Sequence, residues 1–165
     1  MQIKAMQLGQ IGTNCYLLAD EAAKLCAVID PGDSGRAIAS WMAERGLSLR
    51  AILLTHTHFD HVGGLRALHE AVPDAPIWVC RDEFSYDTSM SDGLLHAKWE
   101  YHYYDAADPV PVGALPLRVL RTPRHPPGSV SLLCGAFLSS GATPFQRSFG
   151  PPHFPPAPRV HMPAS

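Results

Sequence analysis

The sequence has few cysteines, almost no net charge and no Cys-x-x-Cys pair. Its four cysteines are widely spaced, at Cys15, Cys26, Cys80 and Cys134, and most lie inside apolar runs, so buried free thiols are expected. The formal net charge of -2 provides no basic field of the kind that attracts a phosphate backbone. A general nucleic-acid-binding function is therefore not expected, and small molecules are the expected partners.

Long apolar runs are also missing. The first ten residues, MQIKAMQLGQ, lack the apolar core of a signal peptide, and no stretch approaches the roughly 20 apolar residues that cross a bilayer. These absences predict a cytoplasmic protein with no membrane partner. A chain of 165 residues with 46% hydrophobic residues is long enough for one cored domain. The pattern gives no indication of oligomeric state.

Short apolar runs and helical patterns alternate along the chain. Strands are expected at residues 2–8, 15–18, 26–29, 51–54, 77–80, 117–120, 130–133 and 136–138. The turn at 9–14 predicts an antiparallel hairpin at the start, whereas 82–105 has weak periodicity and gives no prediction. This order of elements predicts an α/β or α+β fold in which stacked sheets are flanked by helices.

Two amphipathic helices are expected between these strands. In the first, Ile38, Trp41 and Met42 share one face; Asp33 or Ser34 can cap its start and Gly46 ends it. The second carries Val62, Leu65 and Leu68 and stops before Pro73.

The chain changes in composition after Gly150, where prolines become frequent. Proline is poorly tolerated inside helices and central strands. We therefore expect one domain over residues 1–150 and a proline-rich unstructured tail over 151–165.

Polar metal-binding residue types gather directly after the predicted strand 51–54. Because side chains alternate along an extended chain, His56, His58 and Asp60 should project to one side, and a turn into the next helix can bring His61 beside them. Imidazole and carboxylate groups are ligands that suit zinc. A metal site is predicted here; the alternative is a set of surface histidines on a polar loop.

Five segments in order, TNCYLL (13–18), VIDPG (28–32), THTHFDHVGG (55–64), TPRHPPGSVSLL (122–133) and LSSGATPFQRSFG (138–150), resemble the metallo-β-lactamase superfamily. The likeness is strongest to its small bacterial hydrolases of the glyoxalase-II type. It implies an αββα sandwich with metal at one end of the sheets. By the same resemblance, His56, His58 and His125 correspond to the first zinc site, and Asp60 and His61 to ligands of the second.

The sequence departs from the family pattern at Ala142, which stands where the family has an aspartate that bridges two metals. The family also continues to a further histidine, and neither His153 nor His161 matches its setting. The expectation is therefore one zinc ion, where intact relatives hold two. It is also that the sandwich is incomplete at its C-terminus, as in a truncated or frameshifted copy.

The resemblance implies a zinc-dependent hydrolase that acts on a thioester or ester such as a hydroxyacylglutathione. Three histidines with one open position lower the pKa of a bound water to about 7, and Asp60 would orient that water or accept its proton. The replacement at Ala142 predicts weakened turnover. Two alternatives remain: a non-catalytic zinc-binding remnant, and an iron-dependent sulfur dioxygenase whose carboxylate would be missing at position 142.

Overall fold

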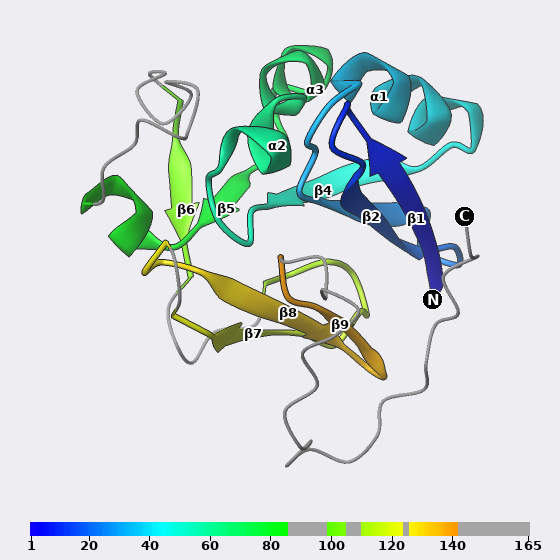
Figure 1. The fold of residues 1–165 in the computed structure, drawn as a ribbon. Coiled ribbons are helices and arrows are strands. Elements are labelled where there is room, and N and C mark those ends of the chain that lie inside the picture. Colours follow the sequence, from blue (N-terminus) through cyan, green and yellow to red (C-terminus); the bar gives the residue numbers. More distant parts are fainter. Residues whose placement is uncertain (86–98, 105–109, 124–125, 142–165) are drawn as a thin grey trace.

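Two β-sheets and one layer of helices are stacked in the part of the chain that the computed structural model describes, residues 1–85, 99–104, 110–123 and 126–141 (Figure 1). The larger sheet has the order β1-β2-β3-β4-β5-β6. Its strands are β1 (Gln2–Leu8), β2 (Thr13–Asp20), β3 (Leu25–Ile29), β4 (Ser48–Leu53), β5 (Ile77–Val79) and β6 (Tyr101–Tyr103). The smaller sheet contains β7 (Leu117–Arg121), β8 (Val130–Cys134) and β9 (Phe137–Ser139).

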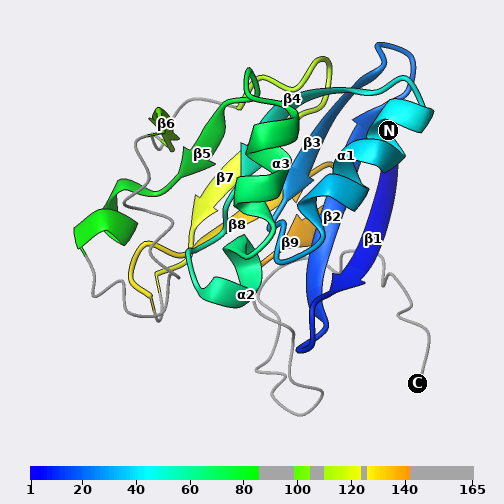
Figure 2. The same ribbon diagram turned by 90° about the horizontal axis from the view of Figure 1, so that it is seen from above.

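The larger sheet begins antiparallel and continues parallel. β1 and β2 pair in register from Gln2 with Ala19 to Leu8 with Thr13, which confirms the predicted hairpin. β3, β4, β5 and β6 run parallel to one another, and helices connect β3 to β4 and β4 to β5. Both connections lie on the same face of the sheet (Figure 2). Because β3 and β4 are parallel, the loops that follow them open at the same edge of the sheet, where ligands commonly bind in sheets of this kind.

The central strands serve two separate cores. Val28 and Ile52 pack in the core between the sheet and the helices, whereas their neighbours Ile29 and Leu53 pack in the core between the two sheets. All four side chains are fully buried. Strands covered on both faces read as continuous apolar runs, because each successive side chain enters a different core.

The first helix is α1 (Gly35–Glu44), close to the predicted span. Gly46 has a φ of 64° and ends the helix as predicted, since glycine adopts this left-handed conformation without strain. The predicted capping interaction was wrong. Ser34 occupies the N-cap position with φ 56° and makes no side-chain cap hydrogen bond. The carboxylate of Asp33 instead accepts hydrogen bonds from the amide and hydroxyl of Ser34.

The second predicted helix is divided into α2 (Phe59–Val62) and α3 (Leu65–Ala71). The break falls at Gly63 and Gly64, where the chain packs against the loop after β3. A Cβ atom on Gly64 would lie 2.6 Å from the carbonyl oxygen of Asp33, so a side chain there would force the two segments apart. The predicted apolar face is confirmed, because Val62, Leu65 and Leu68 are all buried.

The described residues cover part of the stretch 82–105, for which the sequence gave no prediction, and none of the proline-rich tail. The stretch that gave no prediction contains a 3-10 helix, η1 (Arg81–Ser85), and strand β6. His125, Ala142 and the proline-rich tail lie outside the described residues. The described ranges supply three layers of the expected αββα sandwich: one of helices and two of strands (Figure 1).

Two further expectations concern membrane spans and cysteines. No helix in the described part of the chain is long and apolar enough to span a membrane. All four cysteines are free and buried, as predicted.

Candidate metal centre

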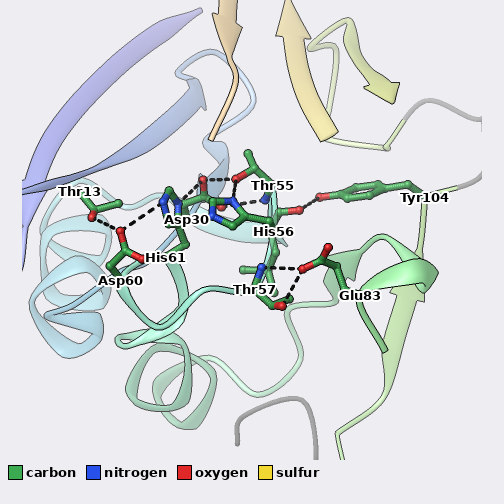
Figure 3. Close-up of polar contacts among 10 residues, drawn as sticks. Thr13, Asp30, Thr55, His56, Thr57, Asp60, His61, Glu83 and Tyr104 are labelled. Atoms are coloured by element: carbon green, nitrogen blue, oxygen red, sulfur yellow. Dashed lines mark hydrogen bonds and ion pairs between the residues drawn. The ribbon is translucent and has the colours of Figure 1, made fainter. Parts of the chain in front are cut away.

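The loop that leaves β4 and helix α2 carry four side chains that the sequence predicts as metal ligands, His56, His58, Asp60 and His61. Figure 3 shows three of them, His56, Asp60 and His61, close together. The ring centroid of His56 lies 4.7 Å from that of His58 and 4.0 Å from that of His61. Nε2 of His61 lies 3.5 Å from Oδ2 of Asp60. These contacts arise because the strand ends at Leu53 and α2 starts at Phe59, so the chain turns within a few residues.

The two threonines of this loop are held by carboxylates on other elements. Thr55 donates from its amide to Oδ1 of Asp30 at 2.8 Å and from its hydroxyl to Oδ2 at 2.6 Å. Asp30 is 1% exposed and follows β3 directly. The family resemblance predicts that Asp30 braces this loop and does not itself bind metal, and its two hydrogen bonds to Thr55 confirm the brace.

Thr57 is held in the same manner by Glu83, a residue that the sequence analysis missed. Its amide and hydroxyl both donate to Oε2 of Glu83, at 2.9 and 2.7 Å. Glu83 belongs to η1, and no motif in the surrounding sequence distinguishes it from the exposed acids nearby. Only its burial, at 1% exposure, reveals it.

Asp30 also fixes the ring of His61. Nδ1 of His61 lies 3.0 Å from Oδ2 of Asp30, so the Nδ1–H donates to the carboxylate and Nε2 faces Asp60. Burial alone lowers the pKa of His61, but the charge and hydrogen bond of Asp30, together with the charge of Asp60, outweigh it and leave the pKa raised. The same negative surroundings favour any other cation at this position. A carboxylate behind a histidine is the usual support of a metal ligand.

The pKa of His56 is shifted in the opposite direction to that of His61. Burial first, and then the charge of His61, lower the pKa of His56 to about 4, so its ring is neutral at neutral pH. Its Nδ1 lies 3.1 Å from the hydroxyl of Thr55. A neutral imidazole is the form that binds a metal ion.

Asp60 is oriented by the N-terminal hairpin. The hydroxyl of Thr13, at the start of β2, donates to Oδ2 of Asp60 at 2.8 Å. Thr13 is 5% exposed and the side chain of Asp60 is 23% exposed, so this contact is partly buried. Thr13 is the first residue of the segment TNCYLL, and the sequence alone predicts no role for it.

The smaller sheet meets the loop at Thr55. The amide of Val130, at the start of β8, donates to the carbonyl of Thr55 at 2.9 Å. Gly141 packs so closely that a Cβ there would lie 2.2 Å from Oγ1 of Thr55 and 3.1 Å from Nδ1 of His56. Ala142, the next residue in the chain, lies outside the described residues, and its place at the metal site stays a prediction.

The donor set suits a divalent ion such as zinc or iron, since a neutral imidazole, an oriented imidazole and a carboxylate lie side by side. Within the described ranges, which leave out His125, no three His, Cys, Asp or Glu side chains have a geometry that could hold a metal ion. The structure thus brings together His56, His58, Asp60 and His61, and their role as ligands stays a prediction. His125 is not placed.

The Metallo-beta-lactamase superfamily profile matches residues 8–161. The probable metallo-hydrolase YqgX of Bacillus subtilis is 34% identical over 160 residues, which covers 91% of this chain and 74% of that protein. The hydroxyacylglutathione hydrolase of Gloeobacter violaceus is 32% identical over 134 residues. That match covers 76% of this chain and 49% of the enzyme, so this chain spans about half of its length.

Solved structures agree with the sequence comparisons. The crystal structure of TTHA1623 in a di-iron-bound form superposes with a TM-score of 0.70 at 29% identity, covering 93% of this chain and 79% of that chain. The expected resemblance is confirmed by both kinds of comparison. On the extent of the profile match and the identity to YqgX, the chain belongs to the metallo-β-lactamase superfamily.

Proposed function

We propose that this chain is a metal-dependent hydrolase that holds one divalent ion, zinc in the first instance, with His56, His58 and His125. The observation that carries the proposal is the support of the histidine loop by Asp30. This buried carboxylate accepts two hydrogen bonds from Thr55, the residue before His56, and also holds the neighbouring ring of His61. Such support is typical of metal sites.

The proposed substrate class is a thioester or ester of a small molecule, such as a hydroxyacylglutathione. Support comes from the relative whose name states that activity. A bound divalent ion supplies Lewis acidity to the carbonyl and activates water. Asp60, oriented by the hydroxyl of Thr13, is placed to hold that water or to accept its proton.

A second candidate, a metal-binding protein without turnover, is favoured by Ala142. The family's bridging aspartate is absent there, so the second ion would be held by Asp60 and His61 without a shared carboxylate. Loss of one ion also removes part of the stabilisation of the developing oxyanion.

One experiment separates these candidates. The purified chain is analysed for metal content, and hydrolysis of S-lactoylglutathione is measured before chelation, after chelation and after addition of Zn²⁺ or Fe²⁺. About one ion per chain with turnover that chelation abolishes and metal restores supports the hydrolase. Bound metal without turnover supports the second candidate.

The matched control is the double variant His56→Ala/His58→Ala, which should bind no metal and show no turnover. A wild-type chain that binds neither ion under these conditions would overturn both candidates.

A further inference from the structure

We infer that Glu83 is a positioning residue for the metal site: it holds the histidine loop from the side opposite Asp30 and joins that loop to the segment that follows His125. The inference rests on the proposed metal binding and adds a residue and a role to it. Its basis is the contacts of Glu83 with Thr57 and Gly128.

Asp30 and Glu83 anchor the histidine loop in the same way. In Thr55-His56-Thr57-His58, each threonine donates twice, from its amide and its hydroxyl, to one buried carboxylate. Asp30 receives the pair from Thr55 and Glu83 receives the pair from Thr57. Figure 3 shows the two anchored threonines on either side of His56, so the main chain is fixed directly before and after this residue. Without Glu83 only the first half of the loop is anchored.

Glu83 also contacts Gly128. A Cβ on this glycine would lie 2.4 Å from Oε1, 2.8 Å from Cγ and 2.8 Å from the amide nitrogen of Glu83, so Gly128 packs directly on both the side chain and the main chain of Glu83. Gly128 lies in a tight turn in which the hydroxyl of Ser129 donates to the carbonyl of Pro126 at 2.7 Å. His125 immediately precedes that turn in the sequence. One side chain therefore contacts both segments that carry the predicted ligands.

The buried charge of Glu83 also favours a positioning role. Asp82, the neighbouring acid, is exposed and pairs with Arg121 on the surface. Glu83 is buried, and within the described residues it faces Thr57 and Gly128 and pairs with no cation. A buried carboxylate without a cationic partner is unfavourable for stability, so a purely structural role is better served by an uncharged side chain. Oε2 accepts both hydrogen bonds from Thr57 and Oε1 lies against Gly128, where glutamine would place an NH2 group in one of these two positions.

The test compares Glu83→Gln with Asp82→Asn, because both remove one negative charge near the site and only Glu83 contacts the loop. Zinc affinity is measured by competition with a chelating dye, and the absorption spectrum of bound Co²⁺ reports the ligand geometry. Loss of such support typically weakens metal binding by about 10–100-fold. We expect a loss of that size and an altered Co²⁺ spectrum for Glu83→Gln. Asp82→Asn should stay within about threefold of wild type with an unchanged spectrum.

A second pair of variants covers the case in which Glu83→Gln fails to fold. Thr57→Val removes the hydroxyl donor and keeps the shape of the side chain, whereas Thr57→Ser keeps the donor. The expected result is weakened zinc binding in the valine variant and near wild-type binding in the serine variant.

The outcomes distinguish the two proposals. Wild-type affinity and spectrum in Glu83→Gln, or in Thr57→Val where the former does not fold, would overturn the role of Glu83 and leave the metal site standing. A wild-type chain that binds no zinc would overturn both proposals.

Discussion

Oδ2 of Asp30 receives two donors at once, the hydroxyl of Thr55 at 2.6 Å and Nδ1 of His61 at 3.0 Å. A single carboxylate oxygen thus connects the start of the histidine loop to the helix that follows it. Because Asp30 has a φ of 50°, which asparagine tolerates well, the variant Asp30→Asn tests the carboxylate without disturbing the backbone.

We expect Asp30→Asn to lower both stability and metal affinity, since an amide nitrogen cannot accept these hydrogen bonds. An unsatisfied buried donor costs about 1–3 kcal/mol, and lost support of a ligand weakens binding by about 10–100-fold. Chemical denaturation and chelator competition measure the two effects. Asp20→Asn, whose carboxylate accepts only exposed amides, serves as the control. Unchanged zinc affinity in Asp30→Asn would contradict the bracing role.

The hydroxyl of Thr13 predicts an effect on turnover. Removal of a hydrogen bond to a charged group costs about 1.5–3 kcal/mol, so Thr13→Val should lower kcat by roughly tenfold or more, while KM changes by less than about twofold. The measurement is the steady-state hydrolysis of S-lactoylglutathione. Thr13→Ser keeps the donor and should retain activity. Equal kcat in the valine and serine variants would show that Asp60 needs no such orientation.

Restoration of an aspartate at position 142 should raise the metal content. Two dications about 3.5 Å apart repel by roughly 19 kcal/mol at an effective dielectric constant of about 20, and a bridging carboxylate offsets part of this repulsion. We therefore expect Ala142→Asp to bind close to two ions per chain, as measured by elemental analysis and native mass spectrometry. The variant Ala142→Asn, whose side chain has the shape of aspartate without its charge, should remain near one ion per chain. If both variants hold the same number of ions, the loss of the aspartate does not limit occupancy.

Burial of Glu83 predicts a pH dependence of stability. Burial raises its pKa above the usual value, against the hydrogen bonds from Thr57 and the amide of Gly128, which lower it. The folded chain then holds the proton more tightly than the unfolded chain, so this group stabilises the fold at pH values below about 4.5. That stability is lost as the pH rises through the folded pKa.

The corresponding measurement is the difference in Tm between Glu83→Gln and wild type, both free of metal, from pH 4 to pH 8. Glutamine does not titrate, so the difference should move in favour of the variant as the pH rises. Asp82→Asn is the control and should show a flat difference. Parallel curves for Glu83→Gln and wild type would argue against a charged, buried Glu83.

Strands and helices of the larger sheet could be predicted because their side chains obey local rules. The run Ala51-Ile52-Leu53-Leu54 is apolar at every position, as expected for a strand between two cores. The division of the second helix could not be predicted, since the break at Gly64 depends on contact with Asp33, more than thirty positions earlier in the chain. β6 was missed for a similar reason: a strand of three residues is too short for its alternation to stand out, and its pairing with β5 defines it.

The candidate site divides in the same way. His56, His58, Asp60 and His61 form a local motif, so their proximity was predictable from spacing. Glu83 and Thr13 come from distant elements and look like ordinary polar residues in the sequence. Their importance depends on burial and on which carboxylate faces which threonine, which only the fold determines.

The hydrogen bond from Val130 to Thr55 has a mechanical implication. This hydrogen bond connects β8 of the smaller sheet to Thr55, which follows β4 of the larger sheet. His56 is the next residue after Thr55. A larger side chain at Leu53 or Leu132, in the core between the sheets, would push the two sheets apart. We expect this to strain the hydrogen bond from Val130 to Thr55 and to rotate the imidazole of His56. The distance between the two sheets is therefore expected to influence the metal affinity of the proposed site.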